Sequence, residues 1–109
     1  MVMIANKRFE LVYAPEVKQH LQAIEKRYHS LIRRTIEEQL QDEPDRETRN
    51  RKPLRRPAEF GATWEIRFGP GNRLRVYYEI EVDRTEVWIL AIGEKERDRL
   101  WIGGEEIEL

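Results

Sequence analysis

The chain has 109 residues, of which 38% are charged, with a formal net charge of −1 and no cysteine. This length suits one domain, residues 1–109, that buries a core without a metal or disulfide staple. The lack of cysteine excludes disulfides and thiol catalysis, and we find neither a secretory signal nor an apolar run of about 18 residues. We therefore expect a cytoplasmic protein with no membrane span.

Charge is distributed unevenly along the chain, although the total is close to zero. Residues 46–75 contain nine arginines or lysines and three glutamates, whereas residues 94–109 contain three basic and six acidic side chains. The basic middle and the acidic C-terminal segment cancel in the total. Net charge alone therefore gives no signal for a polyanionic partner.

The N-terminal part of the chain predicts a strand followed by helices. Residues 7–13 (KRFELVY) alternate apolar side chains with charged or smaller ones, as in a strand that joins a sheet. Pro15 suits the first turn of a helix, and apolar side chains then recur every three or four residues up to Leu40. Because Tyr28-His29-Ser30 is a candidate break, we predict two antiparallel helices, the second beginning near Leu31.

A long connection is predicted after the helices. Pro44 ends the helical region, because proline removes a backbone donor and disfavours helix in the residue before it. Residues 46–62 contain two further prolines and show no sustained period, so we expect a surface loop. Loops of this length are uncommon unless they are functional or disordered.

The middle of the chain predicts a meander of three strands. Residues 64–68 (WEIRF) alternate apolar and charged side chains, and the turn formers at 69–72 (GPGN) then reverse the chain. In the second strand, 73–80, one face carries Leu74, Val76, Tyr78 and Ile80, and the other carries Arg73, Arg75, Tyr77 and Glu79. After a turn at 83–85, residues 87–92 are apolar throughout, which is typical of a strand covered on both faces.

The C-terminal segment is predicted to be a short helix followed by a tail. Residues 94–101 (EKERDRLW) form the expected polar helix, which Gly103-Gly104 ends, and residues 102–109 are a candidate flexible tail. The fold class expected from the whole chain is α+β. It consists of an antiparallel sheet of about four strands, an N-terminal helical hairpin packed on it, and the short C-terminal helix.

The order of these elements resembles that of the RelE/ParE superfamily of bacterial toxins. RLRVYYEI at 73–80 and WILAIGEKERDRLW at 88–101 carry the resemblance, which extends from Phe9 to Trp101 and is closest to the RelE-like branch. It implies a type II toxin that is neutralised by a small antitoxin protein. It further implies ribosome-dependent cleavage of mRNA in the A site without a cofactor, whereas ParE-like relatives poison DNA gyrase instead.

The resemblance also implies which residues act. Arg75 matches the family arginine that stabilises the scissile phosphate, and Arg67 matches a basic residue on the preceding strand. Lys95 and Trp101 stand where the family usually has an arginine and a tyrosine. Glu65 stands where the RelE-like pattern usually has another basic residue.

The chemistry of RNA cleavage without a metal gives these residues candidate roles. Such cleavage requires activation of the 2′-OH, stabilisation of a dianionic phosphorane and protonation of the leaving 5′ oxygen. Arg67 and Arg75 share one face of neighbouring strands, so their forked donors can clamp one phosphate. Glu65 is a candidate base or a salt-bridge partner of the arginines. Lys95 is a candidate further cation or acid, or else a solvated helix residue.

Further side chains are candidates for contact with RNA. They are basic residues, which can bind phosphate, and a tryptophan, which can stack on a base: Arg51, Lys52, Arg55, Arg56, Arg73 and Trp101. A soluble loop is the alternative interpretation of the basic run. His20 and His29 lack the spacing and neighbours of a metal site, so no metal ligand is predicted.

Three functions follow from the sequence. The first is a RelE-like endoribonuclease whose partners are the antitoxin, the ribosome and mRNA. The second is a ParE-like gyrase inhibitor without catalytic activity. The third is a catalytically degenerate member of the same fold that only binds an antitoxin-like partner, and the residues that depart from the family pattern favour it.

Overall fold

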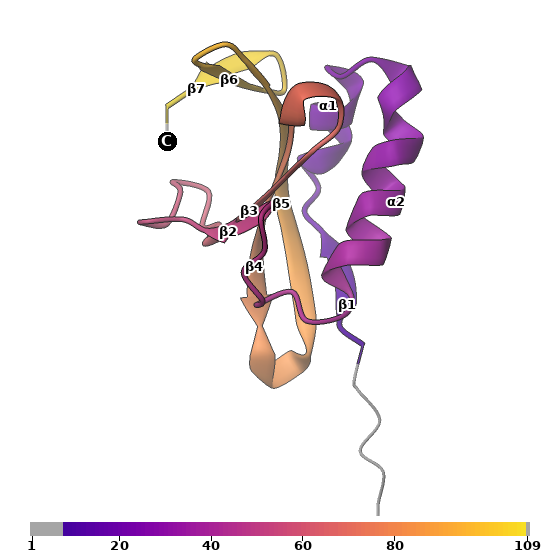
Figure 1. Ribbon diagram of the computed structural model, residues 1–109, viewed down its shortest axis with the longest axis vertical. Helices are drawn as coiled ribbons and strands as arrows, with labels where there is room; N and C mark the ends of the chain where they lie inside the picture. Colours follow the sequence, from indigo (N-terminus) through magenta and orange to yellow (C-terminus); the bar gives the residue numbers. More distant parts are fainter. Residues whose placement is uncertain (1–7, 109) are drawn as a thin grey trace, which may run out of the picture.

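The structure, a computed structural model, describes residues 8–108, which form one sheet flanked by helices on one side (Figure 1). Within this range the elements are, in chain order, β1 (Glu10–Tyr13), α1 (Val17–Gln22), α2 (His29–Leu40), β2 (Arg51–Pro53), β3 (Trp64–Phe68), β4 (Leu74–Glu81), β5 (Glu86–Glu96), β6 (Arg99–Ile102) and β7 (Glu105–Ile107). Short 3₁₀ turns precede α2 and join β3 to β4 and β4 to β5.

The central strand of the sheet is β5, the longest of the seven strands in residues 8–108. The strand order is β2-β3-β4-β5-β6-β7 with antiparallel neighbours, and β1 pairs with β5 in parallel. Along the edge that faces away from β4, β5 pairs first with β1 and then, from Gly93 onward, with β6. The chain is thus α+β, as expected, but with a larger and mixed sheet.

The expectation of about four strands is wrong. The four predicted strands are present, and β2, β6 and β7 are added to them. These additional strands have three or four residues each, too few to show an alternating pattern in the sequence. The predicted connection at 46–62 contains β2, where Arg51 pairs with Ile66 of β3.

The predicted N-terminal helical hairpin is also wrong. One long helix, α2, has 12 residues and begins at His29, whereas α1 has only six residues and ends at Gln22. Glu25 interrupts the helical backbone with φ −52° and ψ 134°. Helix α1, with less than two turns, is too short to form one arm of a helical hairpin. Helix α2 therefore provides most of the helical cover (Figure 1).

The predicted C-terminal helix is a β-hairpin. Strand β5 continues to Glu96, Arg97 reverses the chain with φ 59°, and β6 then pairs back onto β5. Residues 102–107, predicted as the start of a flexible tail, complete β6 and form β7. Gly103 and Gly104 have positive φ and form the turn between these two strands, and Leu109 lies outside the described residues.

Apolar side chains pack on both faces of the sheet. On the face covered by α2, the core includes Ile66, Phe68, Leu74, Val76 and Tyr78 of the sheet and Ile32, Ile36 and Leu40 of the helix. A smaller core on the other face consists of Ala62, Tyr77, Ala91, Leu100 and Ile102. The predicted faces of β3, and of β4 from Leu74 onward, are confirmed, as is the burial of β5 from both sides. Arg73, predicted on the second strand, lies outside β4.

Two local features decide how the central strand is packed. A β-bulge opposite Tyr77 and Tyr78 shifts the alternation of β5, so that Ile89 and Ile92 belong to the helix-side core while Ala91 belongs to the other. At Gly93 the backbone of β6 approaches very closely. A Cβ atom there would lie 2.5 Å from the carbonyl oxygen of Trp101, so only glycine allows this pairing.

We therefore predict that Gly93→Ala destabilises the fold, because the added methyl group pushes β6 away from β5. The expected loss is about 1–3 kcal/mol of unfolding free energy, measured by urea denaturation with tryptophan fluorescence. Gly71→Asn is the control, because Gly71 has φ +62° with open space around it and asparagine tolerates that conformation. A Gly93→Ala protein as stable as the wild type would contradict the close approach.

Candidate active site

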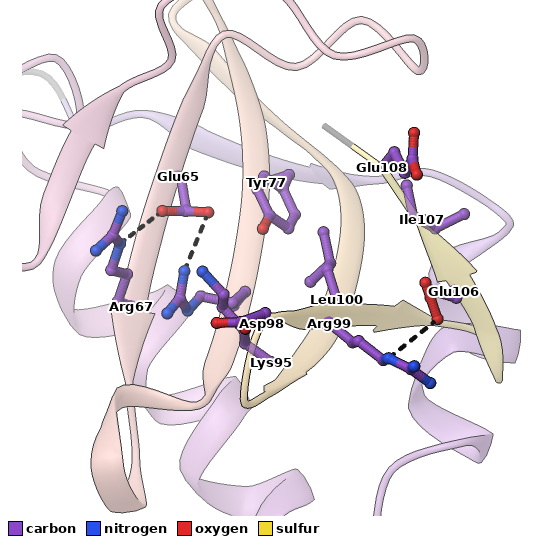
Figure 2. Close-up of a pocket in the computed structure, with 11 residues that line it drawn as sticks. Glu65, Arg67, Tyr77, Lys95, Asp98, Arg99, Leu100, Glu106, Ile107 and Glu108 are labelled. Carbon is purple, nitrogen blue, oxygen red and sulfur yellow. Dashed lines mark hydrogen bonds and ion pairs between the residues drawn. The ribbon is translucent and has the colours of Figure 1, made fainter.

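A cleft of about 370 Å³ opens on the face of the sheet that α2 leaves uncovered. Strands β3, β4 and β5 form one side, and the β6–β7 hairpin forms the other (Figure 2). The lining residues are Glu65, Arg67, Arg75, Tyr77, Lys95, Asp98, Arg99, Leu100, Glu106, Ile107 and Glu108. All four predicted catalytic residues are among them.

The pairing of β3 with β4 places the first charged side chains of the cleft. Glu65 lies opposite Tyr77, and Arg67 lies opposite Arg75. Because side chains alternate along each strand, these four residues project from the same face. The sequence prediction of a shared face for Glu65, Arg67 and Arg75 is confirmed.

Glu65 bridges the two arginines. Its Oε1 atom accepts a hydrogen bond of 2.7 Å from Nε of Arg67, and its Oε2 atom lies 3.4 Å from Nη1 of Arg75 (Figure 2). Nε of Arg75 also donates to the carbonyl oxygen of Asn72 at 3.0 Å. Like charges directly opposite each other on neighbouring strands repel, so the carboxylate is what allows this arrangement.

Glu65 is only 5% exposed, and yet its carboxyl group is ionised at neutral pH. Burial raises its pKa, but hydrogen bonds from Tyr77 and Arg67 and the positive charges of Arg75 and Arg67 outweigh burial. The net result is a pKa below the ordinary value of a glutamate. Glu65 therefore carries its negative charge across the physiological pH range.

Tyr77 was not among the predicted site residues, although its position two residues after Arg75 was a usable signal. Burial, together with the negative charge of Glu65, raises the pKa of its hydroxyl well above the ordinary value. The hydroxyl thus stays protonated and can donate to Glu65. Phe60 packs edge-on against the ring, with 5.7 Å between the ring centres.

The β6–β7 hairpin brings charges that the sequence did not assign to the site. Arg99 and Glu106 line the cleft from this hairpin, and Asp98 and Glu108 line it from the residues just before β6 and just after β7. Nε of Arg99 lies 3.7 Å from Oε1 of Glu106. The predicted helix would also have placed Asp98 and Arg99 near Lys95, because residues three and four positions apart are neighbours on a helix. Glu106 and Glu108 come from the segment predicted as a flexible tail, so no sequence signal placed them beside Lys95. That lysine reaches the cleft from the extended end of β5.

The predicted RNA contacts on the basic segment do not gather at the cleft. Arg51 is 6% exposed and donates to backbone oxygens of Arg46 and Gln39, so it ties the end of α2 to β2. Lys52 forms a 3.2 Å ion pair with Glu47. The two remaining side chains, exposed on the connection between β2 and β3, are Arg55 and Arg56.

Arg73 and Trp101, which were predicted to contact RNA, also lie away from the cleft. They line a second cavity of about 310 Å³ beside α1. Arg73 precedes β4 with helical backbone angles, so the alternation of the strand does not include it, and its guanidinium group lies 5.3 Å from the centre of the Tyr28 ring. Leu100 and Ile102 pack in the cleft-side core, so Trp101 between them faces the other way.

The two histidines bond to backbone groups. Nε2 of His29 lies 2.9 Å from the carbonyl oxygen of Ile24, and Nδ1 of His20 lies 3.2 Å from the backbone nitrogen of Ile92.

Among residues 8–108, no three His, Asp or Glu side chains are grouped so that they could hold a metal ion. Nor is any helix in this range long and apolar enough to cross a membrane.

Comparison with known proteins agrees with this architecture. Residues 11–99 match the family described as ParE toxin of type II toxin-antitoxin system, parDE. The fold is similar to that of a chain in the toxin–antitoxin complex RelBE2 from Mycobacterium tuberculosis, with a TM-score of 0.65 and 25% identity over 81% of this chain and 92% of the other. No curated protein matches. The chain therefore belongs to the ParE toxin family, within the RelE/ParE superfamily, and is the toxin of a type II toxin–antitoxin system with a cognate antitoxin as its partner.

Proposed function

We propose that this toxin is a metal-independent endoribonuclease that cleaves mRNA on the ribosome and so inhibits translation. The observation that carries the proposal is the convergence of Arg67, Arg75 and Lys95 around Glu65 in one cleft, although they come from three strands. Three cations that meet in a cleft fit the charge of a phosphodiester in its transition state.

The two arginines bind the scissile phosphate in this proposal. Arg67 contacts Glu65 through Nε, and 46% of its side chain is exposed, so its remaining donors are accessible to a phosphate. Arg75 is held at both Nε and Nη1, which fixes the plane of its guanidinium group before the substrate arrives. Donors fixed in advance stabilise developing charge without reorganising during the reaction. Lys95 supplies a third positive charge near the leaving oxygen.

Glu65 acts mainly as the residue that positions the arginines. A general base works best when its pKa lies near the operating pH, and the pKa of Glu65 is lowered instead. Its two oxygens are engaged by Arg67 and Arg75. The salt-bridge interpretation of Glu65 thus has more support than the role of a base.

The cleft has few groups that can transfer a proton, and this favours a reaction that depends on the ribosome. None of the described residues that line the cleft is a histidine, and Tyr77 keeps its proton because its pKa is raised. The side chains of the cleft therefore have a clearer role in stabilising the charge of the transition state than in transferring protons. Correct positioning of the RNA by the ribosome can supply a large part of the remaining acceleration.

Inhibition of DNA gyrase by binding is the second candidate function. The match to ParE toxins over residues 11–99 favours it. So does the charge of the cleft, because its described lining residues include four cations and four carboxylates. A balanced cleft attracts a polyanion less strongly than a basic one.

Primer extension on mRNA held by translating ribosomes tests the first candidate. We expect new 5′ ends within the A-site codon, only when ribosomes are present. Arg75→Ala should lower the cleavage rate on the order of 10²–10³-fold, because one fixed donor to the transition state is lost. Arg75→Lys should recover only part of this loss, since lysine keeps the charge but not the forked geometry.

The control for that experiment is Arg34→Ala, which removes an exposed arginine of α2 and should cleave at the wild-type rate. Each variant is first checked for cooperative unfolding in urea. Uncut mRNA together with loss of gyrase supercoiling activity would move the assignment to the second candidate. If neither activity is present, the chain is the degenerate binding protein.

The lowered pKa of Glu65 leads to a pH-dependent prediction for stability. A carboxylate with a lowered pKa stabilises the folded state above its unfolded pKa, and this contribution is lost as pH falls through the folded pKa. We expect the wild type to exceed Glu65→Gln in unfolding free energy above about pH 5 and to lose this advantage below about pH 4.

Urea denaturation between pH 3 and pH 7 measures this difference. The matched control is Glu38→Gln on the exposed surface of α2, which should show no comparable change with pH. A difference between wild type and Glu65→Gln that stays constant over the whole range would show that the ionised carboxylate does not stabilise the fold.

A further inference from the structure

The edge of β5 that faces away from β4 has a gap between its two partner strands, β1 and β6. Strand β1 pairs with residues 86–89 of β5, and β6 pairs with residues 93–96. Within the described sheet, residues 90–92 have no strand partner on this edge. The backbone N–H of Ile92 lies in the gap and donates a hydrogen bond of 3.2 Å to Nδ1 of His20. A side chain of α1 thus takes the place of a strand.

The same imidazole ring touches the turn of the β6–β7 hairpin. A Cβ atom added at Gly103 would lie 3.3 Å from Cδ2 of His20, so the turn rests against the ring. His20 therefore connects α1, β5 and the hairpin. Because the hairpin forms one side of the candidate active site, the position of this ring also bears on the shape of the cleft.

We propose that His20 is a pH-sensitive latch, whose neutral imidazole closes the gap in β5 and holds the β6–β7 hairpin in place. Nδ1 accepts the proton of Ile92 N–H only while it has a free lone pair, so the ring must be the Nε2–H tautomer. Protonation places a hydrogen on Nδ1, and two donors then face each other. The N–H of Ile92 loses its acceptor, and the contact opens.

The environment of the ring sets the direction of the switch. Burial lowers the pKa of His20 below its ordinary value, and the nearby carboxylate of Glu16 partly opposes this effect. The latch therefore stabilises the fold above the unfolded pKa of about 6.5, and the stabilisation is lost as pH falls through the lowered folded pKa. Glu105 of β7 lines a cavity of about 390 Å³ together with Glu16 and His20, and it offers the protonated ring another partner.

The second histidine of the chain has the opposite requirement. Nε2 of His29 faces the carbonyl oxygen of Ile24, an acceptor, so this ring must donate there. Protonation leaves that donor in place. His29 therefore serves as an internal control, because protonation of its ring would not remove its hydrogen bond to Ile24.

Amide hydrogen exchange followed by NMR tests the latch in the full chain. Between pH 7.5 and pH 5, the protection factors of Ile92 and of residues 99–107 should fall about two- to tenfold in the wild type, the range expected from one lost hydrogen bond. His20→Asn supplies an acceptor near the position of Nδ1 that does not titrate, and its protection should not change with pH. His29→Gln should keep the wild-type response.

The ¹⁵N chemical shifts of the wild-type imidazole rings provide a measurement that needs no variant. The midpoint of His20 titration should coincide with the loss of protection at Ile92. Constant wild-type protection, an equal fall in His20→Asn, loss of the response in His29→Gln, or non-coincident midpoints would each overturn the proposal. These readouts do not use catalysis, so they remain decisive whichever reaction the toxin performs.

Discussion

The bridge from Glu65 to Arg67 and Arg75 is the interaction on which the candidate site depends. The register of β3 and β4 places the two arginines directly opposite each other, where their charges repel. A buried carboxylate between them offsets the repulsion and contacts both guanidinium groups. Burying the charges of Glu65 and Arg75 is not an efficient way to stabilise a sheet, because apolar residues of similar volume often stabilise it as well or better. The arrangement is therefore better explained by a function for its donors than by a contribution to folding.

Strand β5 connects this site to the rest of the molecule. Its first half is buried between the two cores, and its last residues carry Lys95 to the cleft. At Gly93 the absence of a side chain lets β6 approach, and one residue earlier His20 completes the edge of the strand. The wall of the cleft is thus held by a glycine and a histidine that take no part in the proposed chemistry. A substitution in α1 can in this way affect the cleft on the opposite face of the sheet.

The charges of the cleft separate the two candidate activities of the toxin. Part of the donor capacity of Arg67 and Arg75 is used by Glu65, and the hairpin adds carboxylates on the other side. An RNA phosphate must then be bound by the donors that remain and by Lys95. A binding toxin needs no such free donors, because complementary charge and shape are enough to bind a protein surface. Which of the two activities the toxin has therefore depends on whether the guanidinium groups of Arg67 and Arg75 bind a phosphate, and not on the fold.

Local patterns in the sequence determined the arrangement of β3 and β4. Their strict alternation placed Glu65, Arg67 and Arg75 on one face, and glycine, proline and asparagine marked the turn between the strands. The resemblance to the superfamily, together with the phosphate chemistry, then gave Arg67, Arg75 and Lys95 their candidate roles. What these signals share is that they depend on residues close together in the chain.

Only the tertiary structure decided the rest. The run EKERDR consists of good helix formers, but pairing with the central sheet makes it the end of β5 and the beginning of β6. Long-range contacts likewise bury Arg51 against α2 and place Trp101 at a second cavity, away from the cleft. Periodicity shows which side chains share a face of one segment. It does not show which segments pair, because pairing energy comes from residues far apart in the chain.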